Sequence, residues 1–389
     1  MTATGREWGY SPATGESNGS AGIVCNVLNL TRGPETNQSL VGGHMPDNAP
    51  SAAEDPSSPD NPQLVDRFNR QVTYLRISVT DRCDFRCVYC MGEDMSFVPR
   101  AQVLTLEEIA EIACAFVELG VRKLRITGGE PLVRRNVMWL LEQLGRLHGL
   151  HELTLTTNGS QLAKFAGRLR DAGVSRVNVS LDSLRADRFR QLTRTGDLET
   201  VLSGIQAACE AGFDGIRINS VLLRNRNHDE ALDLVRFAIE RSLDIAFIEE
   251  MPLGDIGDHS RAEAYLSSDE LKAELERHLT LLDTTEQSGG PARYFRVADT
   301  ATKIGFISPH SHNFCASCNR VRLTTEGRLL LCLGQEHSVD LRQVIRGQRG
   351  NRDALRRAIL ASMTIKPKGH DFNLNGRTVI FRHMNATGG

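Results

Sequence analysis

The sequence predicts an α/β protein: a partial (βα)6 barrel of the TIM type, followed by a smaller C-terminal α+β domain. Between residues 74 and 248, six short apolar runs alternate with amphipathic segments of about a dozen residues. Parallel strands are joined by such crossover helices, and six repeats are fewer than a full barrel needs. A doubly wound open sheet is the alternative. In either architecture, ligands bind at the carboxyl ends of the strands.

The predicted elements follow one another in regular order. The first helix starts with a capping box, because Thr105 is followed three residues later by Glu108. Glycines stand where helical patterns end, at Gly120, Gly173 and Gly212. The predicted strands are 74–79, 124–127, 153–156, 176–180, 216–222 and 245–248. The predicted helices are 105–119, a segment within 134–147, 162–172, 185–193, 198–211 and 229–241.

The alternation is lost after about residue 255, so we divide the chain there. Residues 66–255 form the predicted barrel, residues 256–389 the C-terminal domain, and residues 1–65 an N-terminal extension. In the C-terminal domain we expect strands at 294–297 and 304–308 and a hairpin of 321–324 and 329–333. We expect its helices at 267–277, 338–346 and 353–363.

The extension is predicted to be disordered, because it is rich in Gly, Ser, Pro, Asn and Asp and has few large apolar residues. An organellar transit peptide would be rich in Arg and poor in acids, and a secretory signal would combine a basic start with a compact apolar stretch. Neither pattern is present in the extension. We therefore expect a cytoplasmic location.

The overall composition disfavours two classes of partner. The formal net charge of −2 provides no global basic field for nucleic acid or an anionic membrane. No apolar run approaches the roughly 18 residues of a membrane-spanning helix. Any anion site must therefore be built locally, from a few well-placed cations.

Six of the nine cysteines fall into two groups of three. In a protein without an export signal, metal or redox chemistry explains such groups better than disulfides do. We interpret Cys114 and Cys209 as core residues and Cys25 as incidental. The two groups are Cys83, Cys87 and Cys90, and Cys315, Cys318 and Cys332.

The first group directly follows the first predicted strand, with three residues between Cys83 and Cys87 and two between Cys87 and Cys90. Three thiolates on a short loop can bind three irons of a cubane cluster and leave the fourth iron open for a chelating ligand. Structural zinc is the alternative, but zinc prefers four ligands and symmetric pairs of cysteines. Asp81 and Asp84, the nearby candidates for a fourth ligand, are unusual in structural zinc sites.

The second group also provides three thiolates, which would again leave one iron of a cubane cluster open. Cys332 lies fourteen positions after Cys318. Arg320 and Arg322 follow Cys318 and would share one face of a strand. Buried arginines beside a cluster suggest an anionic or purine-like ligand. Zinc remains open as an alternative here, because a histidine could complete the site. The candidates are His310, His312 and His337.

The first cysteine group and its neighbours resemble the radical S-adenosylmethionine (SAM) enzymes. The resemblance rests on two motifs, CDFRCVYC after the first strand and TGGEP, at 127–131, after the second. In that family the open iron chelates SAM, and reductive cleavage releases a 5′-deoxyadenosyl radical. Glu130 of the second motif would accept from the SAM ammonium group. The resemblance places Tyr89, Gly129, Ser180 and Met251 against SAM.

From about residue 72 to the end, the chain resembles more narrowly the GTP 3′,8-cyclases of molybdenum-cofactor biosynthesis. The markers are LRISVTDRCDFRCVYCM, KLRITGGEPLVRR, LTTNG, VNVSLDSL, FIEEMPLG, SHNFCASCNRVRL and the closing Gly388-Gly389. The resemblance implies two [4Fe-4S] clusters, the second of which holds the guanine ring of GTP. It also implies that the closing double glycine reaches into the active site and takes part in catalysis.

In this family the radical abstracts the ribose 3′ hydrogen of GTP, and the resulting carbon radical attacks C8 of guanine. The product is 3′,8-cyclo-7,8-dihydro-GTP. The resemblance implies that the product passes to the synthase of cyclic pyranopterin monophosphate. It also implies a low-potential electron donor and a homodimer.

The family's contacts to GTP can be carried over to this sequence. Arg217 stands where the family often has Lys, and Ala246 where some members have a basic residue, so Arg134 or Arg135 would have to compensate. Lys123 is a weaker candidate. The matching residues are Arg76, Arg125, Thr156, Arg217, Arg320, Val321 and Arg322.

Three other functions compete with this interpretation. Another radical SAM enzyme with an auxiliary cluster, acting on a peptide, would usually have more C-terminal cysteines. A zinc-stapled binding module would have neither iron nor sulfide. A nucleic-acid modifying enzyme is disfavoured by the balanced charge.

Overall fold

The computed structural model describes residues 63–388, apart from 93–94, 255, 257–258, 287–288, 375–379 and 381. The predicted disorder of residues 1–62, the interpretation of Cys25 and the role of Gly389 lie outside the described residues. The fold includes Leu64, which the sequence pattern assigned to the extension. Leu64 is buried and its carbonyl accepts from Val72 N–H, because a bridge between Val65 and Gln71 turns this segment back onto the core.

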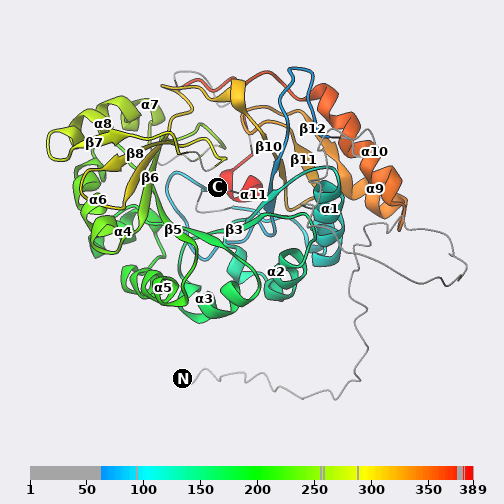
Figure 1. The fold of residues 1–389 in the computed structure, drawn as a ribbon, viewed down its shortest axis with the longest axis horizontal. Coiled ribbons are helices and arrows are strands. Elements are labelled where there is room, and N and C mark those ends of the chain that lie inside the picture. The colour runs from blue at the N-terminus through cyan, green and yellow to red at the C-terminus, as the bar shows by residue number, and fades with distance from the viewer. Residues whose placement is uncertain are drawn as a thin grey trace, which may run out of the picture.

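The barrel strands are parallel and consecutive in one curved sheet, with helices covering its outer face (Figure 1). The fold class is therefore confirmed as α/β, consistent with a partial barrel of the TIM type. The strands are β1 (Tyr74–Ser78), β2 (Lys123–Thr127), β3 (Glu152–Thr157), β4 (Arg176–Ser180), β5 (Gly215–Val221) and β6 (Asp244–Ile248). The helices between them are α1 (Leu106–Glu118), α2 (Val137–Gly145), α3 (Leu162–Asp171), α4 (Ala186–Thr193), α5 (Leu198–Ala211) and α6 (Ala231–Glu240).

The C-terminal strands extend this same sheet at both edges. β9 (Lys303–Ile307) pairs in parallel with β6, and β10 (Arg320–Leu323) pairs in parallel with β1. Antiparallel strands follow outside them: β8 (Arg293–Val297) and β7 (Leu281–Asp283) beyond β9, and β11 (Arg328–Leu330) and β12 (Ser338–Asp340) beyond β10. The two parts that the sequence pattern separates thus share one twelve-stranded sheet.

The remaining helices surround the C-terminal strands. In Figure 1, α9 and α10 lie beside α1, and the short α11 lies inside the ring of strands. They are α7 (Arg261–Ala264), α8 (Ser268–Glu276), α9 (Leu341–Gly347), α10 (Arg352–Ser362) and α11 (Met384–Thr387). The 3₁₀ turns are η1 (Arg100–Gln102), η2 (Pro131–Val133), η3 (His228–Glu230), η4 (Cys315–Ser317) and η5 (Met363–Ile365).

Local sequence signals set the element boundaries. The predicted capping box is present, since Thr105 Oγ1 accepts from Glu108 N–H and the Glu108 carboxylate accepts from Thr105 N–H. The apolar face of α1 packs on the sheet through fully buried residues such as Ile109 and Phe116. Among the described residues, no helix is both long and apolar enough to cross a membrane.

Candidate active site

Two adjoining pockets lie inside the curved sheet, and each contains one of the cysteine groups. The first pocket lies at the carboxyl ends of the barrel strands, where Thr127, Ser180 and Ile248 end β2, β4 and β6. The loop after β1 brings the first cysteine group to this edge. The cysteines of the first pocket are Cys83, Cys87 and Cys90.

The cysteines of the first pocket are free and partly buried. Burial raises the pKa of Cys87 well above its ordinary value, and the neighbouring sulfurs of Cys90 and Cys83 add to that effect. Burial likewise raises the pKa of Cys90 to about 12. Gathered, buried sulfurs that oppose one another's ionisation need a cation to become thiolates. This set of donors fits an iron–sulfur cluster.

Two glycines hold the loop after β2 against the cysteine loop. A Cβ atom at Gly129 would lie 2.3 Å from the carbonyl oxygen of Arg82, and one at Gly128 would lie 2.6 Å from that of Thr80. The Gly129 N–H donates to the Thr80 carbonyl at 2.6 Å. Only glycine permits this backbone approach, so the motif positions the cysteine loop as well as lining the first pocket.

The glutamate of the same motif is turned into the protein. Glu130 is fully buried, and its carboxylate accepts from Thr157 Oγ1, Asn158 N–H and Leu132 N–H. Burial raises its pKa to about 7. Both carboxylate oxygens therefore have protein donors, which fix the position of Glu130 in the loop after β2. Its contact to the SAM ammonium group stays a prediction, because a carboxylate oxygen can accept more than one hydrogen bond.

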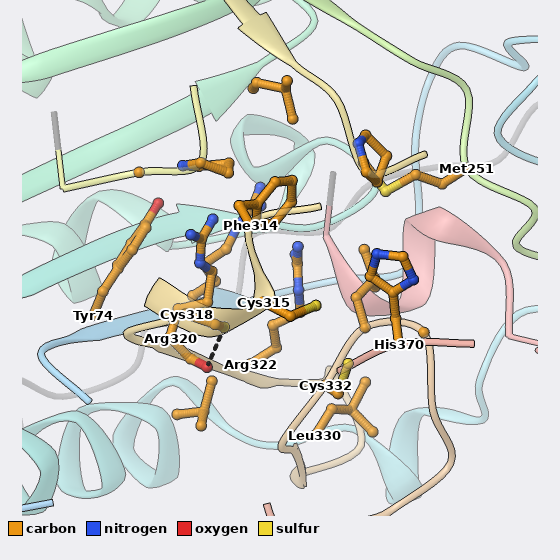
Figure 2. Close-up of a pocket in the computed structure, with 18 of the residues that line it drawn as sticks. Tyr74, Met251, Phe314, Cys315, Cys318, Arg320, Arg322, Leu330, Cys332 and His370 are labelled. Carbon is orange, nitrogen blue, oxygen red and sulfur yellow. Dashed lines mark hydrogen bonds between the residues drawn. The ribbon is translucent and has the colours of Figure 1, made fainter. Parts of the chain in front are cut away.

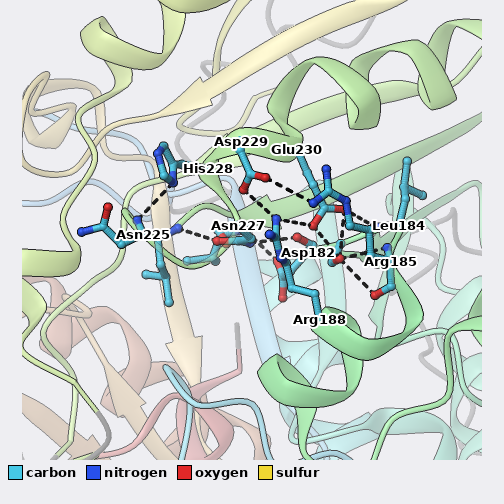
Figure 3. Close-up of polar contacts among 12 residues, drawn as sticks. Asp182, Leu184, Arg185, Arg188, Asn225, Asn227, His228, Asp229 and Glu230 are labelled. Atoms are coloured by element: carbon cyan, nitrogen blue, oxygen red, sulfur yellow. Dashed lines mark hydrogen bonds and ion pairs between the residues drawn. The ribbon is translucent and has the colours of Figure 1, made fainter.

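A polar network supports the far wall of the first pocket (Figure 3). Tyr89 Oη donates to the Asp182 carboxylate at 2.6 Å, and the Asp182 carbonyl accepts from Asn227 Nδ2. Burial raises the pKa of Asp182 to about 6. Beside it, the buried Glu230 accepts from Ser183 Oγ and Arg188. The network fixes the ring of Tyr89 and the segment that follows β4.

The second pocket lies deeper inside the sheet, beside the second cysteine group. Figure 2 shows Cys315, Cys318 and Cys332 close to Arg320 and Arg322. Burial alone would raise the pKa of Cys318, but the positive charges of Arg320 and Lys366 outweigh burial and the net shift is downward. Positive charge beside a cysteine favours its thiolate, which is the form that binds iron.

Five arginines line the second pocket and are all held by the sheet. Arg322, Arg76 and Arg125 are directly paired across β10, β1 and β2, so that three guanidinium groups stand in one row. Alternate residues of a strand face the same side, which puts Arg320 on the same inner face. Arg217, from β5, completes the set, with its Nε 3.0 Å from Asn219 Oδ1 and its Nη1 2.5 Å from Tyr294 Oη.

Within the described part of the chain, none of these five arginines forms an ion pair with a carboxylate, whereas several arginines nearer the surface do. The Nε atoms of Arg76, Arg125 and Arg320 are buried without a hydrogen-bond partner. Burial lowers the pKa of Arg322 to about 10, and Arg320 adds to that shift. Clustered like charges of this kind are costly unless an anion binds among them. An anion bound in the second pocket would remove this cost.

The two pockets adjoin each other. Four residues line both of them: Asn219, Ile248, Met251 and Met384. The two cysteine groups therefore face neighbouring spaces that are separated by no more than one layer of side chains.

Comparisons with known proteins match the two parts of the chain that carry the two cysteine groups. The family model for the Radical SAM superfamily matches residues 77–238, and the model described as Molybdenum Cofactor Synthesis C matches residues 243–372. A GTP 3′,8-cyclase of Pseudomonas putida strain KT2440 is 61% identical over 327 residues, which cover 84% of this chain and 98% of the relative. A GTP 3′,8-cyclase of Saccharophagus degradans is 56% identical and covers 85% of this chain and 99% of its own length. The chain belongs to the GTP 3′,8-cyclase family.

Solved structures support the fold of this cyclase-family chain. Streptococcus suis SuiB bound to S-adenosylmethionine matches with a TM-score of 0.51 at 16% identity, covering 74% of this chain and 66% of SuiB. SuiB bound to the precursor peptide SuiA matches with a TM-score of 0.53 at 15% identity, covering the same shares of both chains. At this identity the likeness concerns the fold alone.

Four of the side chains considered as further zinc ligands in this cyclase-family chain have other partners, whereas His337 lies in a surface pocket that Cys315 also lines. Asp84 accepts from Asn158 Nδ2 and Ser160 Oγ, and Asp81 accepts from Val98 N–H. His310 Nε2 lies 2.9 Å from the Glu250 carbonyl, and His312 lies against the Asp269 carboxylate. No three His, Cys, Asp or Glu side chains in the described ranges converge as ligands of one ion. A cubane instead takes each thiolate at a different iron.

The structure gathers the predicted site residues in the two pockets. The predicted SAM contacts Tyr89, Gly129, Ser180 and Met251 all line the first pocket. Thr156 also lines the first pocket, and Arg125 Nη1 lies 3.4 Å from its hydroxyl. Gly388 lies beside the second pocket, because its carbonyl accepts from Arg322 Nη1 at 2.9 Å. The other predicted GTP contacts line the second pocket: Arg76, Arg125, Arg217, Arg320, Val321 and Arg322.

The proposed substitutes for a basic residue at position 246 do not reach either pocket. Arg134 donates to the carbonyls of Val79 and Leu104, and Arg135 is exposed. The prediction that Arg134 contacts a phosphate is therefore wrong, because its guanidinium group instead binds the carbonyls of two loops. The Nζ atom of Lys123 lies 2.7 Å from Oε2 of Glu152. Its charge therefore neutralises a carboxylate of the protein.

Several pocket residues were not found from the sequence. Tyr74, Phe314, His370 and Met384 line the second pocket. Tyr294 is a further residue of this kind, since its hydroxyl accepts from Arg217. Burial alone would raise the pKa of Tyr74, but Arg125 and Arg76 bring about a net lowering. The position of Tyr74, two residues before Arg76 on one strand, was the available signal, because alternate strand residues share a face.

Replacing Gly129 with alanine is expected to prevent assembly of the first cluster. The added methyl group would meet the Arg82 carbonyl at 2.3 Å and push the two loops apart. Iron content should fall by about half, with a loss of thermal stability. Gly167→Ala is the matched control, because nothing lies within 4 Å of its added Cβ in α3. The free energy of unfolding of that variant should rise by about 0.5–1 kcal/mol, because alanine favours a helix more than glycine does. Normal iron content in Gly129→Ala would contradict this role.

Proposed function

We propose that this chain converts GTP to 3′,8-cyclo-7,8-dihydro-GTP, the first step of molybdenum-cofactor biosynthesis. The observation that carries the proposal is the row of arginines beside the second cysteine group, which have no acidic partner among the described residues and line a pocket that adjoins the first. A triphosphate supplies the negative charge that these arginines lack. The relatives that share 56–61% of its residues bear the name GTP 3′,8-cyclase.

The cofactors of this proposal are two [4Fe-4S] clusters and SAM. Cys83, Cys87 and Cys90 would hold the first cluster, and Cys315, Cys318 and Cys332 the second. When bound, the first cluster and SAM supply a 5′-deoxyadenosyl radical, and the second cluster supplies an open iron for guanine.

The chain's own residues position GTP and exclude water. The guanidinium groups of Arg76, Arg125 and Arg322 present donors in one row, and planar guanidinium groups bind phosphate oxygens in a bidentate manner. Val321 and Leu330 give the same pocket an apolar wall. Such a wall strengthens the electrostatic contacts and protects a carbon radical from solvent.

The last turn of the chain connects the two pockets. Met384 lines both of them, and Arg322 donates to the carbonyl of Gly388. A Cβ atom at Gly388 would lie 2.1 Å from the Thr127 side chain, so this position requires glycine. We assign the closing Gly388-Gly389 a part in catalysis, because Gly388 contacts one of the arginines that we assign to the substrate.

The partners of this reaction follow from its chemistry. Reductive cleavage of SAM needs an electron, so we assign a low-potential electron donor. The cyclised nucleotide passes to a synthase of cyclic pyranopterin monophosphate. A homodimer is proposed on family grounds.

The function is tested by anaerobic incubation of the reconstituted protein with dithionite, SAM and GTP. We expect 5′-deoxyadenosine and a cyclised nucleotide in equal amounts, and iron and sulfide for two clusters per chain. ATP in place of GTP is the control and should give no cyclised product. Stoichiometric zinc without iron would overturn the radical mechanism. SAM cleavage stimulated by a peptide but not by GTP would support the peptide-acting alternative.

A further inference from the structure

Lys366 is a buried lysine that lies outside both pockets. It follows η5 and is 1% exposed, which places it among the largest fully buried side chains of the described residues. Neither the first nor the second pocket includes it in its lining. A buried ammonium group destabilises the fold unless it is paired and hydrogen-bonded. What Lys366 contacts therefore indicates why it is there.

The ammonium group of Lys366 lies between a sulfur and a carboxylate. Its Nζ is 3.7 Å from Sγ of Cys318 and 3.9 Å from Oδ2 of Asp66. The side chain of Asp66 is itself fully buried. Lys366 thus approaches Cys318, a member of the second cysteine group, without taking part in the wall that faces GTP.

A second buried cation fixes this arrangement. Arg70 Nε donates to Asp66 Oδ2 at 2.7 Å. The same guanidinium group donates to the backbone carbonyls of Cys315, Pro367 and Lys368 at 2.6–2.7 Å. Arg70 therefore joins the cysteine loop to the segment that carries Lys366, and Asp66 joins Arg70 to Lys366. The distance between Lys366 and Cys318 is set by this frame rather than by a flexible side chain.

The positive side chains around the second cysteine group differ in whether they line the second pocket. Arg320 and Arg322 line the second pocket, where we propose that GTP binds. Lys366 does not line that pocket, and the groups nearest its ammonium are the Cys318 sulfur and the Asp66 carboxylate. Hydrogen bonds to cluster sulfurs and the net charge near a cluster set its reduction potential. A charge-assisted hydrogen bond in a buried place has a larger effect than an exposed one.

We propose that Lys366 is a positioning residue for the second cluster: it donates to the Cys318 thiolate, compensates its negative charge and raises the reduction potential of the cluster. This inference rests on the proposed function, since it requires a cluster at Cys315, Cys318 and Cys332. It concerns the protein side of the cluster, whereas Arg320 and Arg322 serve the substrate side.

The test is Lys366→Met in the full chain, which keeps the volume and removes the charge. The protein is reconstituted anaerobically, its iron and sulfide are counted, and the midpoint potential of the second cluster is measured by electron paramagnetic resonance during a redox titration. The same titration in a Cys83→Ala/Cys87→Ala/Cys90→Ala background isolates the second cluster. Lys368→Met is the matched control, because Lys368 has the same charge two residues away but is exposed.

We expect Lys366→Met to hold the second cluster with a more negative midpoint potential, Lys366→Arg to return the potential toward that of the wild type, and Lys368→Met to leave it unchanged. Loss of only the second cluster in Lys366→Met, with retention in Lys366→Arg, would equally support the role of the charge. An unchanged potential in Lys366→Met would overturn the inference and leave the proposed function intact. Loss of the cluster in both Lys366 variants would also overturn it, because packing would then be the role. A wild-type chain without a second cluster would overturn the proposed function itself.

Discussion

Cys87→Ala is expected to abolish radical formation, lowering the yield of 5′-deoxyadenosine from SAM by at least ~10³-fold, since no other group in the first pocket can replace the cluster. Cys87 is packed against the core, and burial holds its pKa well above the ordinary value. Removing its sulfur leaves two thiolates for a cluster that needs three protein ligands. GTP turnover should disappear with SAM cleavage.

The measurement is anaerobic turnover with dithionite, with both nucleoside products separated by chromatography. Cys209→Ala is the matched control, because Cys209 is a free, partly buried cysteine on α5 that lines neither pocket. That variant should keep two clusters and normal turnover. Wild-type amounts of 5′-deoxyadenosine from Cys87→Ala would show that the first cysteine group does not generate the radical.

Arg322→Ala is expected to separate the two half-reactions. Arg322 is 7% exposed, stands in the row of arginines and donates to the carbonyl of Gly388. A hydrogen bond to a charged group contributes about 1.5–3 kcal/mol, and a bidentate contact to phosphate about twice that. We therefore expect kcat/KM for GTP to fall by roughly 10²–10³-fold. Reductive cleavage of SAM should continue, because the first pocket does not include Arg322.

The experiment compares 5′-deoxyadenosine with cyclised nucleotide in the same reaction, across a range of GTP concentrations. Arg320→Ala should behave in the same way, since Arg320 stands on the same inner face. Arg236→Ala is the control, because the side chain of Arg236 is 61% exposed on α6. If Arg322→Ala lost both activities equally, the arginine would be a structural residue rather than a substrate contact.

The sequence was most informative where spacing carries chemistry. Cys83, Cys87 and Cys90 could be assigned together, because ligands on one short loop are near each other in any fold. Arg320 and Arg322 could be placed on one face for a similarly local reason, since alternate residues of a strand point the same way. The capping box at Thr105 and Glu108 belongs to the same class of local signal.

Contacts between distant segments were less accessible. The row of Arg322, Arg76 and Arg125 depends on β10 pairing with β1, which brings residue 322 beside residue 76. Local patterns give no sign of that pairing. The prediction that Arg134 contacts a phosphate failed for a related reason. Its place after β2 could be identified from the sequence, but its hydrogen bonds to the carbonyls of Val79 and Leu104 could not.

The sequence by itself determined the alternating strands and helices, the two groups of three cysteines and the family to which they point. These features are local, and periodicity and ligand spacing report them directly. Only the tertiary structure decided that the C-terminal strands continue the barrel sheet at both edges and enclose the two pockets. It alone placed Lys366 beside Cys318, because strand pairing at the sheet edges and the frame of Asp66 and Arg70 join segments about three hundred positions apart.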